Sequence, residues 1–132
     1  MNCYNGEKYL RHALDSVISQ TYKNWEIIFW DNKSTDGSAD IFNSYDDPRF
    51  RYFQAPRHTN LGEARNLAVE KAKGEWCAFL DCDDLWLPKK LAFQTDVILN
   101  EDSRLGLVYG KSCNLIEGGN ATQWGRAMQL KK

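Results

Sequence analysis

The chain has 132 residues, of which 42% are hydrophobic and 13% aromatic, and its formal net charge is -1. This length suits one globular domain with a buried core, and the nearly balanced charge argues against a broad nucleic-acid-binding surface. No apolar run approaches the roughly 18 residues of a membrane-spanning helix. The four cysteines contain no CxxC pair, so we expect reduced thiols in a cytoplasmic protein.

The hydrophobic pattern predicts alternating helices and strands. The first helix carries an apolar stripe at helical spacing, formed by Leu10, Ala13, Leu14, Val17 and Ile18. The apolar run 25–30 is typical of a strand covered on both faces. The elements predicted next are a helix through residues 40–45, a strand at 50–53, a helix from 61 capped by Gly74, a strand at 76–80, a helix after Pro88 and a strand at 105–109. This alternation indicates an α/β fold with a mostly parallel sheet.

Three carboxylates, Asp81, Asp83 and Asp84, follow the predicted strand 76–80. Open α/β sheets bind ligands at the carboxyl ends of their strands. Carboxylates so close together repel one another, which favours a divalent cation with oxygen ligands, such as Mg²⁺ or Mn²⁺. Such a cation would recruit a phosphate. The plain alternative is a solvated loop that contains a helix cap; an EF-hand loop is excluded, because Trp86 would occupy its obligatory glycine position.

Polar loops after two earlier segments should lie at the same edge of the sheet. Tyr4 offers a flat face for a nucleobase, and Asp31 or Asn32 offers an acceptor for a base N–H. Taken singly, Tyr4 could be a packing residue and Asp31 a turn former. Their convergence with the acidic cluster would provide contacts for a base and for a metal-bound diphosphate.

Seven segments, in order over roughly residues 2–110, resemble the family 2 glycosyltransferases of GT-A fold. They are Tyr4-Asn5-Gly6-Glu7, Ser19-Gln20-Thr21-Tyr22, Trp25-Glu26-Ile27-Ile28, Asp31-Asn32-Lys33-Ser34-Thr35-Asp36, Gly62 with Arg65-Asn66, Lys73-Gly74-Glu75, and Leu80-Asp81-Cys82-Asp83-Asp84. The resemblance implies a Rossmann-like fold that binds a nucleotide-diphospho-sugar. It also implies a divalent metal and inversion at the anomeric carbon.

The resemblance also implies roles for individual residues. Tyr4 corresponds to the residue that stacks on the base, and Asn32 sits where many members place an Asp that hydrogen-bonds the base. Asp81, Asp83 and Asp84 match the DxD segment, which contacts ribose and metal-bound diphosphate. We therefore expect a donor site formed by Tyr4, Asn5, Asp31, Asn32, Arg65 and Asp81, with Asp83 and Asp84 as ligands of Mn²⁺ or Mg²⁺.

Two of these residues leave alternatives open. The Asn32 amide oxygen can accept from N3–H of uracil, which favours a UDP-sugar, but its amide protons could also serve other bases. Arg65 could pair with an aspartate of the cluster, approach phosphate, or be a surface arginine.

Expectations about the ends of the chain also follow from the resemblance. Family members carry a hydrophobic strand before the Tyr-Asn turn, of which only residues 1–3 stand here. We expect a sheet that lacks most of this strand. The chain would then be a fragment, a gene product that starts late, or a chain whose partner or second copy supplies the missing strand. The family's general base follows the DxD segment, yet Glu101-Asp102 fits a solvated turn better. We thus expect a partial GT-A domain at residues 1–116, truncated at both ends, and a loosely structured tail at 117–132.

The leading hypothesis is the donor-binding part of an inverting, metal-dependent glycosyltransferase, with activity requiring sequence not present here. The family implies a glycan or lipid-linked acceptor and a location at the inner face of the cell membrane. A second hypothesis is a module that binds a nucleotide sugar or a protein without turnover. A haloacid-dehalogenase-like phosphatase is more remote, because its motif needs a small turn residue where Leu85 and Trp86 stand.

Overall fold

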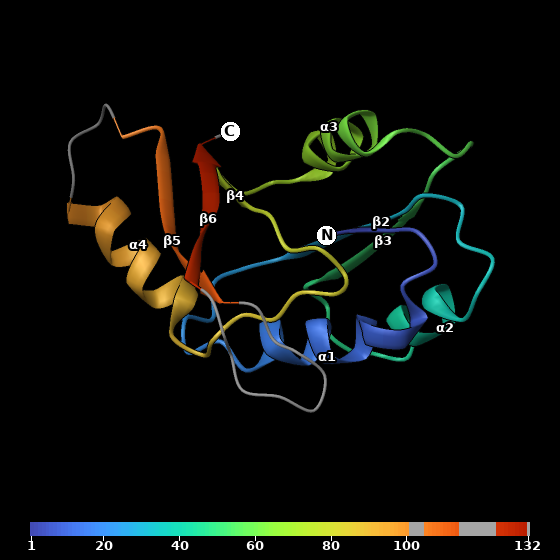
Figure 1. Ribbon diagram of the computed structural model, residues 1–132, viewed down its shortest axis with the longest axis horizontal. Coiled ribbons are helices and arrows are strands. Elements are labelled where there is room, and N and C mark those ends of the chain that lie inside the picture. The colour runs from blue at the N-terminus through green and yellow to red at the C-terminus, as the bar shows by residue number, and fades with distance from the viewer. Residues whose placement is uncertain (101–104, 114–123, 132) are drawn as a thin grey trace.

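The computed structural model describes residues 1–100, 105–113 and 124–131 (Figure 1). Helices and strands alternate through most of this length, as the hydrophobic pattern predicts. The strands are β1 (Asn2–Cys3), β2 (Ile27–Asp31), β3 (Phe50–Gln54), β4 (Trp76–Ala78), β5 (Leu107–Cys113) and β6 (Trp124–Lys131). The helices are α1 (Glu7–Ile18), α2 (Ser38–Asn43), α3 (Leu61–Lys71) and α4 (Lys90–Asn100).

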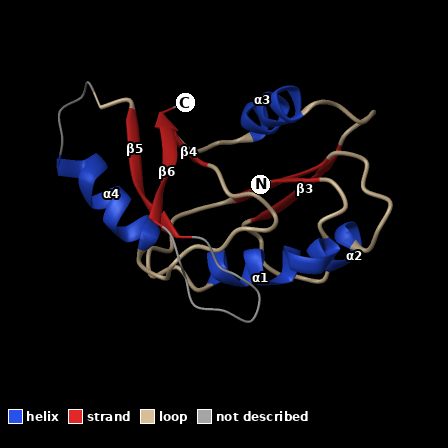
Figure 2. Ribbon diagram, in the orientation of Figure 1, coloured by secondary structure: helices blue, strands red, loops and turns tan. Residues whose placement is uncertain are grey.

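Strands β1, β2 and β3 form a parallel sheet in that spatial order. Figure 2 shows α1 and α2 on one side of this sheet and α3 on the other. All of β2 is buried, and side chains of a strand alternate between the two faces. Ile27 and Phe29 accordingly pack with α1 and α2, whereas Ile28 and Trp30 pack with α3. The predicted α/β fold is confirmed.

The core between the sheet and α1 is built from fully buried aliphatic and aromatic side chains. Leu10 and Leu14 of α1 have no exposed surface, and Phe29 stacks on Phe42 of α2 with ring centroids 4.3 Å apart. Burial of one such side chain stabilises the fold by about 1.5–3 kcal/mol. This packing fixes the start of α1, and with it the Tyr4 turn at the edge of the sheet.

Helix α3 packs closely on the opposite face because its contact residues are small. Ala64 and Ala68 are buried against β2. The helix begins at an Asn60 cap, whose side-chain oxygen accepts a hydrogen bond from the Glu63 N–H at 2.9 Å.

The end of α3 differs from the sequence prediction. The helix ends at Lys71, so the predicted cap at Gly74 is wrong. The Glu26 carboxylate instead accepts hydrogen bonds from the N–H groups of Lys73 (2.6 Å) and Gly74 (3.2 Å), and it pairs with Arg51 at 2.6 Å. A side chain from the start of β2 thus satisfies the backbone that leads from α3 towards β4.

The second sheet is antiparallel, in contrast to the expected mostly parallel arrangement. Its order is β4-β6-β5, with Cys77 opposite Leu130 and Tyr109 opposite Met128. Strand β6 lies within residues 117–132, for which we expected a loosely structured tail. The sequence signal for β6 is weak, because a charged Arg126 interrupts the period-two pattern of Trp124, Met128 and Leu130.

Strand β1 hydrogen-bonds to β2, and the pairing includes Met1 before the strand. The N–H of Trp30 donates to the Met1 carbonyl at 2.9 Å, and that of Asn32 donates to the Cys3 carbonyl at 2.8 Å. The Met1 amino group donates to the Ile28 carbonyl at 2.8 Å. Among the described strands, β4 is paired with β6 and not with β1.

A buried glutamine ties α1 to the segment that follows the acidic cluster. The Gln20 side chain is fully buried; its amide nitrogen donates to the Leu87 carbonyl at 2.8 Å, and its oxygen accepts from the Leu91 N–H at 3.0 Å. Next to it, the Thr21 N–H donates to the Pro88 carbonyl at 2.8 Å. These bonds hold the start of α4 against the end of α1.

Replacing Gln20 with alanine should destabilise the fold. The substitution removes the bonds to Leu87 and Leu91, and each buried polar group left without a partner costs about 1–3 kcal/mol. We expect the free energy of unfolding, measured in urea by circular dichroism, to fall by about 2–4 kcal/mol for Gln20→Ala. The matched control is Gln54→Ala at an exposed position, expected within about 0.5 kcal/mol of the parent. Equal losses in the two variants would contradict the role of Gln20.

Candidate functional site

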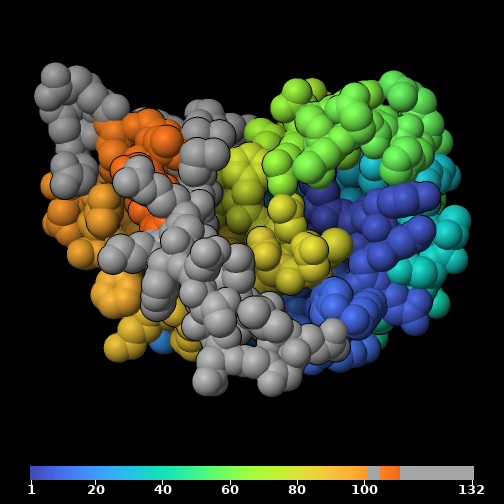
Figure 3. Space-filling model, viewed as in Figure 1, coloured from blue at the N-terminus to red at the C-terminus, as the bar shows by residue number. Residues whose placement is uncertain are grey.

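Residues from four separate segments surround one cavity at the carboxyl edge of the parallel sheet. Its volume is about 350 Å³. Its lining residues are Asn2, Cys3, Tyr4, Asn32, His58, Thr59, Asn60, Leu61, Ala64, Asp81, Cys82 and Asp83. In Figure 3 the yellow segment that carries the aspartates lies at the surface between α3 (green) and the N-terminal residues (blue). The predicted convergence of Tyr4, Asn32 and the acidic cluster is therefore present, and we call this space the donor cavity.

Tyr4 and His58 form an aromatic wall of the donor cavity. Tyr4 is 52% exposed, and its ring centroid lies 4.3 Å from that of His58 with the planes tilted by 56°. The His58 Nδ1 lies 3.0 Å from the Asn32 carbonyl oxygen, which positions the imidazole. A partly exposed aromatic pair can receive the flat face of a base. Sequence reasoning missed His58, because it lies in an irregular stretch without hydrophobic periodicity.

Asn32 is buried and uses its side-chain amide to hold the loop before α3. Its amide nitrogen donates to the Thr59 carbonyl at 2.8 Å, and its amide oxygen accepts from the Thr59 N–H at 3.0 Å and the Thr59 hydroxyl at 3.1 Å. The expected hydrogen bond to a base would have to share or replace these contacts. In this structure Asn32 positions the loop that carries His58 and Thr59.

Asp31 and Asn5 shape the loops of the site and are not among the residues that line the donor cavity. Asp31 is fully buried and accepts hydrogen bonds from the Tyr52 hydroxyl at 2.5 Å and the Ser34 N–H at 2.7 Å. Asn5 has a positive φ of 53°, a conformation that asparagine tolerates, and its side-chain oxygen accepts from the Thr35 N–H at 2.8 Å. These bonds connect the turn before α1 to the loop after β2.

The acidic loop, residues 81–84, concentrates negative charge beside a single arginine. Arg65 on α3 binds both oxygens of Asp81, at 2.8 and 3.1 Å. Of the three roles considered for Arg65, the structure shows the pairing with an aspartate of the cluster. Asp84 is largely accessible, yet partial burial, followed by the charges of Asp83 and Asp81, raises its pKa. A divalent cation would relieve this repulsion.

The residues that the structure describes contain no group of three histidine, cysteine or acidic side chains arranged to hold a metal ion. Asp83 and Asp84 supply hard oxygen ligands, as Mg²⁺ and Mn²⁺ prefer. A Mg²⁺ site typically combines one or two carboxylates with substrate phosphates and water. The residues present therefore fit a metal that completes its coordination with a bound diphosphate.

Helix α1 holds the chain just beyond the acidic loop. The Trp86 N–H donates to the Ser16 hydroxyl at 3.1 Å, and the Lys90 ammonium lies 3.5 Å from the Trp86 ring centroid. Within the loop, the Asp84 N–H donates to the Asp81 carbonyl at 3.1 Å. Sequence reasoning missed this support, because Ser16 and Trp86 are distant in the chain.

Two thiols meet beneath the donor cavity. Cys3 of β1 is buried, and Cys82 of the acidic loop is partly buried against the same cluster. A hydrogen bond from the Cys82 thiol lowers the pKa of Cys3 to about 7. A Cβ atom on Gly6 would lie 2.7 Å from each sulfur, so the close approach of the two thiols requires glycine at this position.

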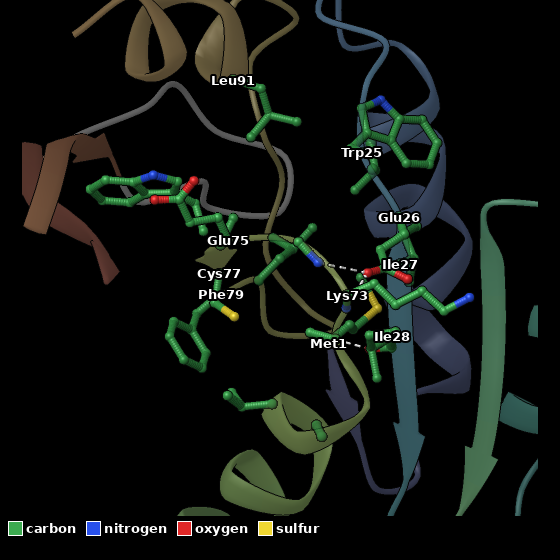
Figure 4. Close-up of a pocket in the computed structure, with 18 of the residues that line it drawn as sticks. Met1, Trp25, Glu26, Ile27, Ile28, Lys73, Glu75, Cys77, Phe79 and Leu91 are labelled. Atoms are coloured by element: carbon green, nitrogen blue, oxygen red, sulfur yellow. Dashed lines mark hydrogen bonds between the residues drawn. The ribbon is translucent and has the colours of Figure 1, made fainter. Parts of the chain in front are cut away.

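A second, larger cavity of about 650 Å³ lies between β2 and β4 (Figure 4). In Figure 4, Trp25, Glu26 and Ile27 line it from the β2 side, and Cys77 and Phe79 face it from the β4 side. Its walls are mainly apolar. The smaller cavity is the candidate donor site, because it gathers Tyr4, Asn32 and Asp83 at the strand ends.

The parallel sheet, its flanking helices and the acidic loop at its carboxyl edge define a glycosyltransferase domain of GT-A fold. The model of the family described as Glycosyl transferase family 2 matches residues 1–125, and the chain belongs to this family. The predicted family is therefore confirmed, which also disfavours the phosphatase alternative.

Similar proteins include enzymes and solved structures of this class. The chain is 33% identical over 110 residues to the Escherichia coli UDP-Glc:alpha-D-GlcNAc-diphosphoundecaprenol beta-1,3-glucosyltransferase WfgD, covering 83% of this chain and 43% of WfgD. The structure of S. aureus TarS in complex with UDP-GlcNAc matches with a TM-score of 0.70 and 29% identity, covering 74% of this chain and 29% of that chain. The chain thus spans less than half the length of either protein.

A third comparison concerns the fold alone. The mannosyltransferase PcManGT from Pyrobaculum calidifontis, solved in complex with GDP-Man and Mn²⁺, matches with a TM-score of 0.69 and 24% identity. The match covers 80% of this chain and 32% of PcManGT. Among the described residues of this chain, no helix has the length and hydropathy needed to cross a membrane.

The contacts of Asn32 lead to a test of its role in the loop. Asn32→Asp removes the donor to the Thr59 carbonyl and places a negative charge beside it, so we expect the free energy of unfolding to fall by about 1–3 kcal/mol at pH 7. The measurement is urea denaturation followed by circular dichroism.

The matched control for this substitution is Asn60→Asp, which keeps the acceptor at a helix N-terminus where a carboxylate is favourable. We expect its stability to stay within about 0.5 kcal/mol of the parent. If Asn32→Asp is no more destabilising than Asn60→Asp, the Asn32 amide does not hold this loop.

Proposed function

We propose that this chain is the donor-binding part of a glycosyltransferase that transfers a sugar from a UDP-sugar to a glycan or lipid-linked acceptor with inversion. One observation carries the proposal: Tyr4, Asn32 and Asp83 line one cavity at the carboxyl edge of a family 2 domain. The similarity to TarS, which was solved with UDP-GlcNAc, supports UDP as the nucleotide. The similarity to WfgD, whose name gives a diphosphoundecaprenol acceptor, supports a lipid-linked acceptor.

Within this proposal, Tyr4 stacks on the uracil ring, with His58 bordering the same wall of the donor cavity. Asn32 meets the polar edge of the base after exchanging part of its contact with Thr59. Asp31 and Asn5 hold the loop after β2 beside the turn before α1, because their side chains accept hydrogen bonds from the backbone N–H groups of Ser34 and Thr35. The base therefore enters between the turn before α1 and the loop before α3.

Asp83 and Asp84 would hold Mn²⁺ or Mg²⁺, and Asp81 would face the ribose while Arg65 fixes its carboxylate. When bound, the metal supplies positive charge that stabilises the leaving diphosphate. Partial burial, followed by the charges of Asp83 and Asp81, raises the pKa of Asp84, and a cation bound beside this carboxylate would stabilise its charged form.

Transfer also needs a base that takes the proton from the acceptor hydroxyl, which typically accelerates such a reaction by about 10²- to 10⁴-fold. Glu101 and Asp102, weighed from the sequence for this role, lie outside the described residues. Our proposal assigns donor binding to this chain and leaves the base unassigned. Calorimetry with UDP and a donor-hydrolysis assay distinguish the alternatives, since binding without turnover favours a non-catalytic module.

Removing a metal-binding carboxylate should weaken metal-dependent binding of UDP. We expect the affinity for UDP in Mn²⁺, measured by isothermal titration calorimetry, to fall at least about tenfold for Asp83→Asn or Asp84→Asn, a loss of about 1.4 kcal/mol. Chelation of Mn²⁺ should have a similar effect on the parent chain. Asp46→Asn, on the exposed connection between α2 and β3, is the control and should bind as the parent does. If the UDP affinity is the same with and without Mn²⁺, and the same in the parent and in both variants, the metal site is excluded.

Removing the base platform should weaken UDP binding with or without metal. Base–aromatic stacking contributes about 1–3 kcal/mol, so Tyr4→Ala should lower the UDP affinity roughly 5- to 100-fold, while inorganic diphosphate should bind equally to parent and variant. The control is Tyr9→Ala, which removes a partly exposed tyrosine on α1. A Tyr4→Ala variant that is folded and binds UDP like the parent would show that the base lies elsewhere.

A further inference from the structure

We propose that Cys3 and Cys82 form a redox pair, whose reversible disulfide ties the acidic loop to β1 and weakens metal-dependent binding of UDP. The covalent part rests only on the positions of the two thiols. The effect on binding rests on the function proposed above. Neither cysteine is needed for the donor contacts already described.

The proximity of the sulfurs follows from the space around Gly6. A Cβ atom at this glycine would lie 2.7 Å from the Cys3 Sγ and 2.7 Å from the Cys82 Sγ. Because both sulfurs lie 2.7 Å from this one position, they are at most 2 × 2.7 = 5.4 Å apart. A disulfide bond is about 2.05 Å long, so these two hydrogen-bonded sulfurs would have to approach each other by at most about 3.4 Å to join.

The two cysteines differ in their freedom to make this displacement. Cys3 is 2% exposed, is paired in register with Asp31 of β2, and its thiol donates to the Ser38 hydroxyl at 3.5 Å. Cys82 is partly exposed and lies in the irregular segment between β4 and α4. Cys82 is therefore the thiol that an oxidant can reach, and the acidic loop is the part that moves.

Oxidised glutathione is a sufficient oxidant for this step. The proton of the Cys82 thiol passes along its hydrogen bond to the Cys3 sulfur as the Cys82 sulfur attacks the glutathione disulfide, which forms a mixed disulfide and releases one glutathione thiolate. The Cys3 sulfur then loses its proton, attacks the Cys82 sulfur and displaces the second glutathione. The protein loses two electrons and two protons, and these convert one oxidised glutathione into two reduced molecules.

The position of Cys82 gives the disulfide its effect on binding. Cys82 lies between Asp81 and Asp83 in sequence, and all three line the donor cavity together with Cys3. A bond from Cys82 to β1 would draw the centre of the acidic loop towards the core. The neighbouring carboxylates would then lose part of the freedom they need to arrange around a metal and a diphosphate. Oxidation would lower affinity without removing any ligand.

Peptide mapping tests the covalent part. The chain is equilibrated in glutathione buffers from fully reduced to fully oxidised, free thiols are blocked, and a chymotryptic digest is analysed by mass spectrometry. Chymotrypsin cleaves after Phe79, which separates Cys77 from Cys82. We expect the disulfide-linked peptide pair that contains Cys3 and Cys82 to dominate the oxidised samples and to disappear with dithiothreitol. Disulfides that join other cysteines instead, or glutathione left on Cys82 without closure, would overturn the proposal.

Calorimetry with UDP and Mn²⁺ tests the effect on binding. In the parent chain we expect oxidation to lower the UDP affinity about tenfold, and dithiothreitol to restore it. Cys3→Ser and Cys82→Ser should each lose this oxidation-dependent change, whereas Cys77→Ser, in the wall of the larger cavity, should retain it. A mapped Cys3–Cys82 disulfide with unchanged UDP affinity would overturn the switch. Failure of the reduced chain to bind UDP would instead refute the proposed function, and the peptide map would still decide the redox pair.

Discussion

The burial of β2 on both faces is the constraint on which the rest of this structure depends. Its apolar side chains must be covered by α1 and α2 on one side and by α3 on the other. The connections between these helices and the strands must then pass over the ends of the sheet. The loops that line the donor cavity are thus consequences of a core requirement, and the polar residues at the end of β2 are held by a strand that has little freedom to move.

A second constraint is the charge of the acidic loop. Three carboxylates within four residues destabilise one another unless each has a counter-charge, a donor or water. In this structure Arg65 neutralises Asp81, whereas Asp83, which lines the cavity, and the neighbouring Asp84 stay exposed. The fold therefore distinguishes one carboxylate that is paired with an arginine from two that stay exposed. This division could not be read from the spacing of the aspartates alone.

Most of the fold could be predicted from the sequence, because strong local patterns specify its central elements. The apolar run of β2 and the stripe of α1 are examples. The convergence of Tyr4 with the aspartates was predicted from the rule for parallel sheets and is present, although β4, which precedes the aspartates, pairs with β6 in the antiparallel sheet. The contacts that sequence reasoning missed join residues far apart in the chain. Gln20 meets Leu91, and Asn32 meets Thr59, through hydrogen bonds that no periodicity encodes. Strand β6 was missed for a related reason, since its antiparallel partners β4 and β5 are set by tertiary pairing.

The hydrogen bonds from α1 to the chain beyond the acidic loop have a dynamic consequence. Ser16 in the last turn of α1 and Gln20 just after this helix hold Trp86, Leu87 and Leu91. Local opening in proteins occurs in cooperative units whose members share such contacts. By this principle the last turn of α1 and the start of α4 belong to one cooperative unit, which couples the order of the acidic loop to a helix that contributes no residue to the donor cavity.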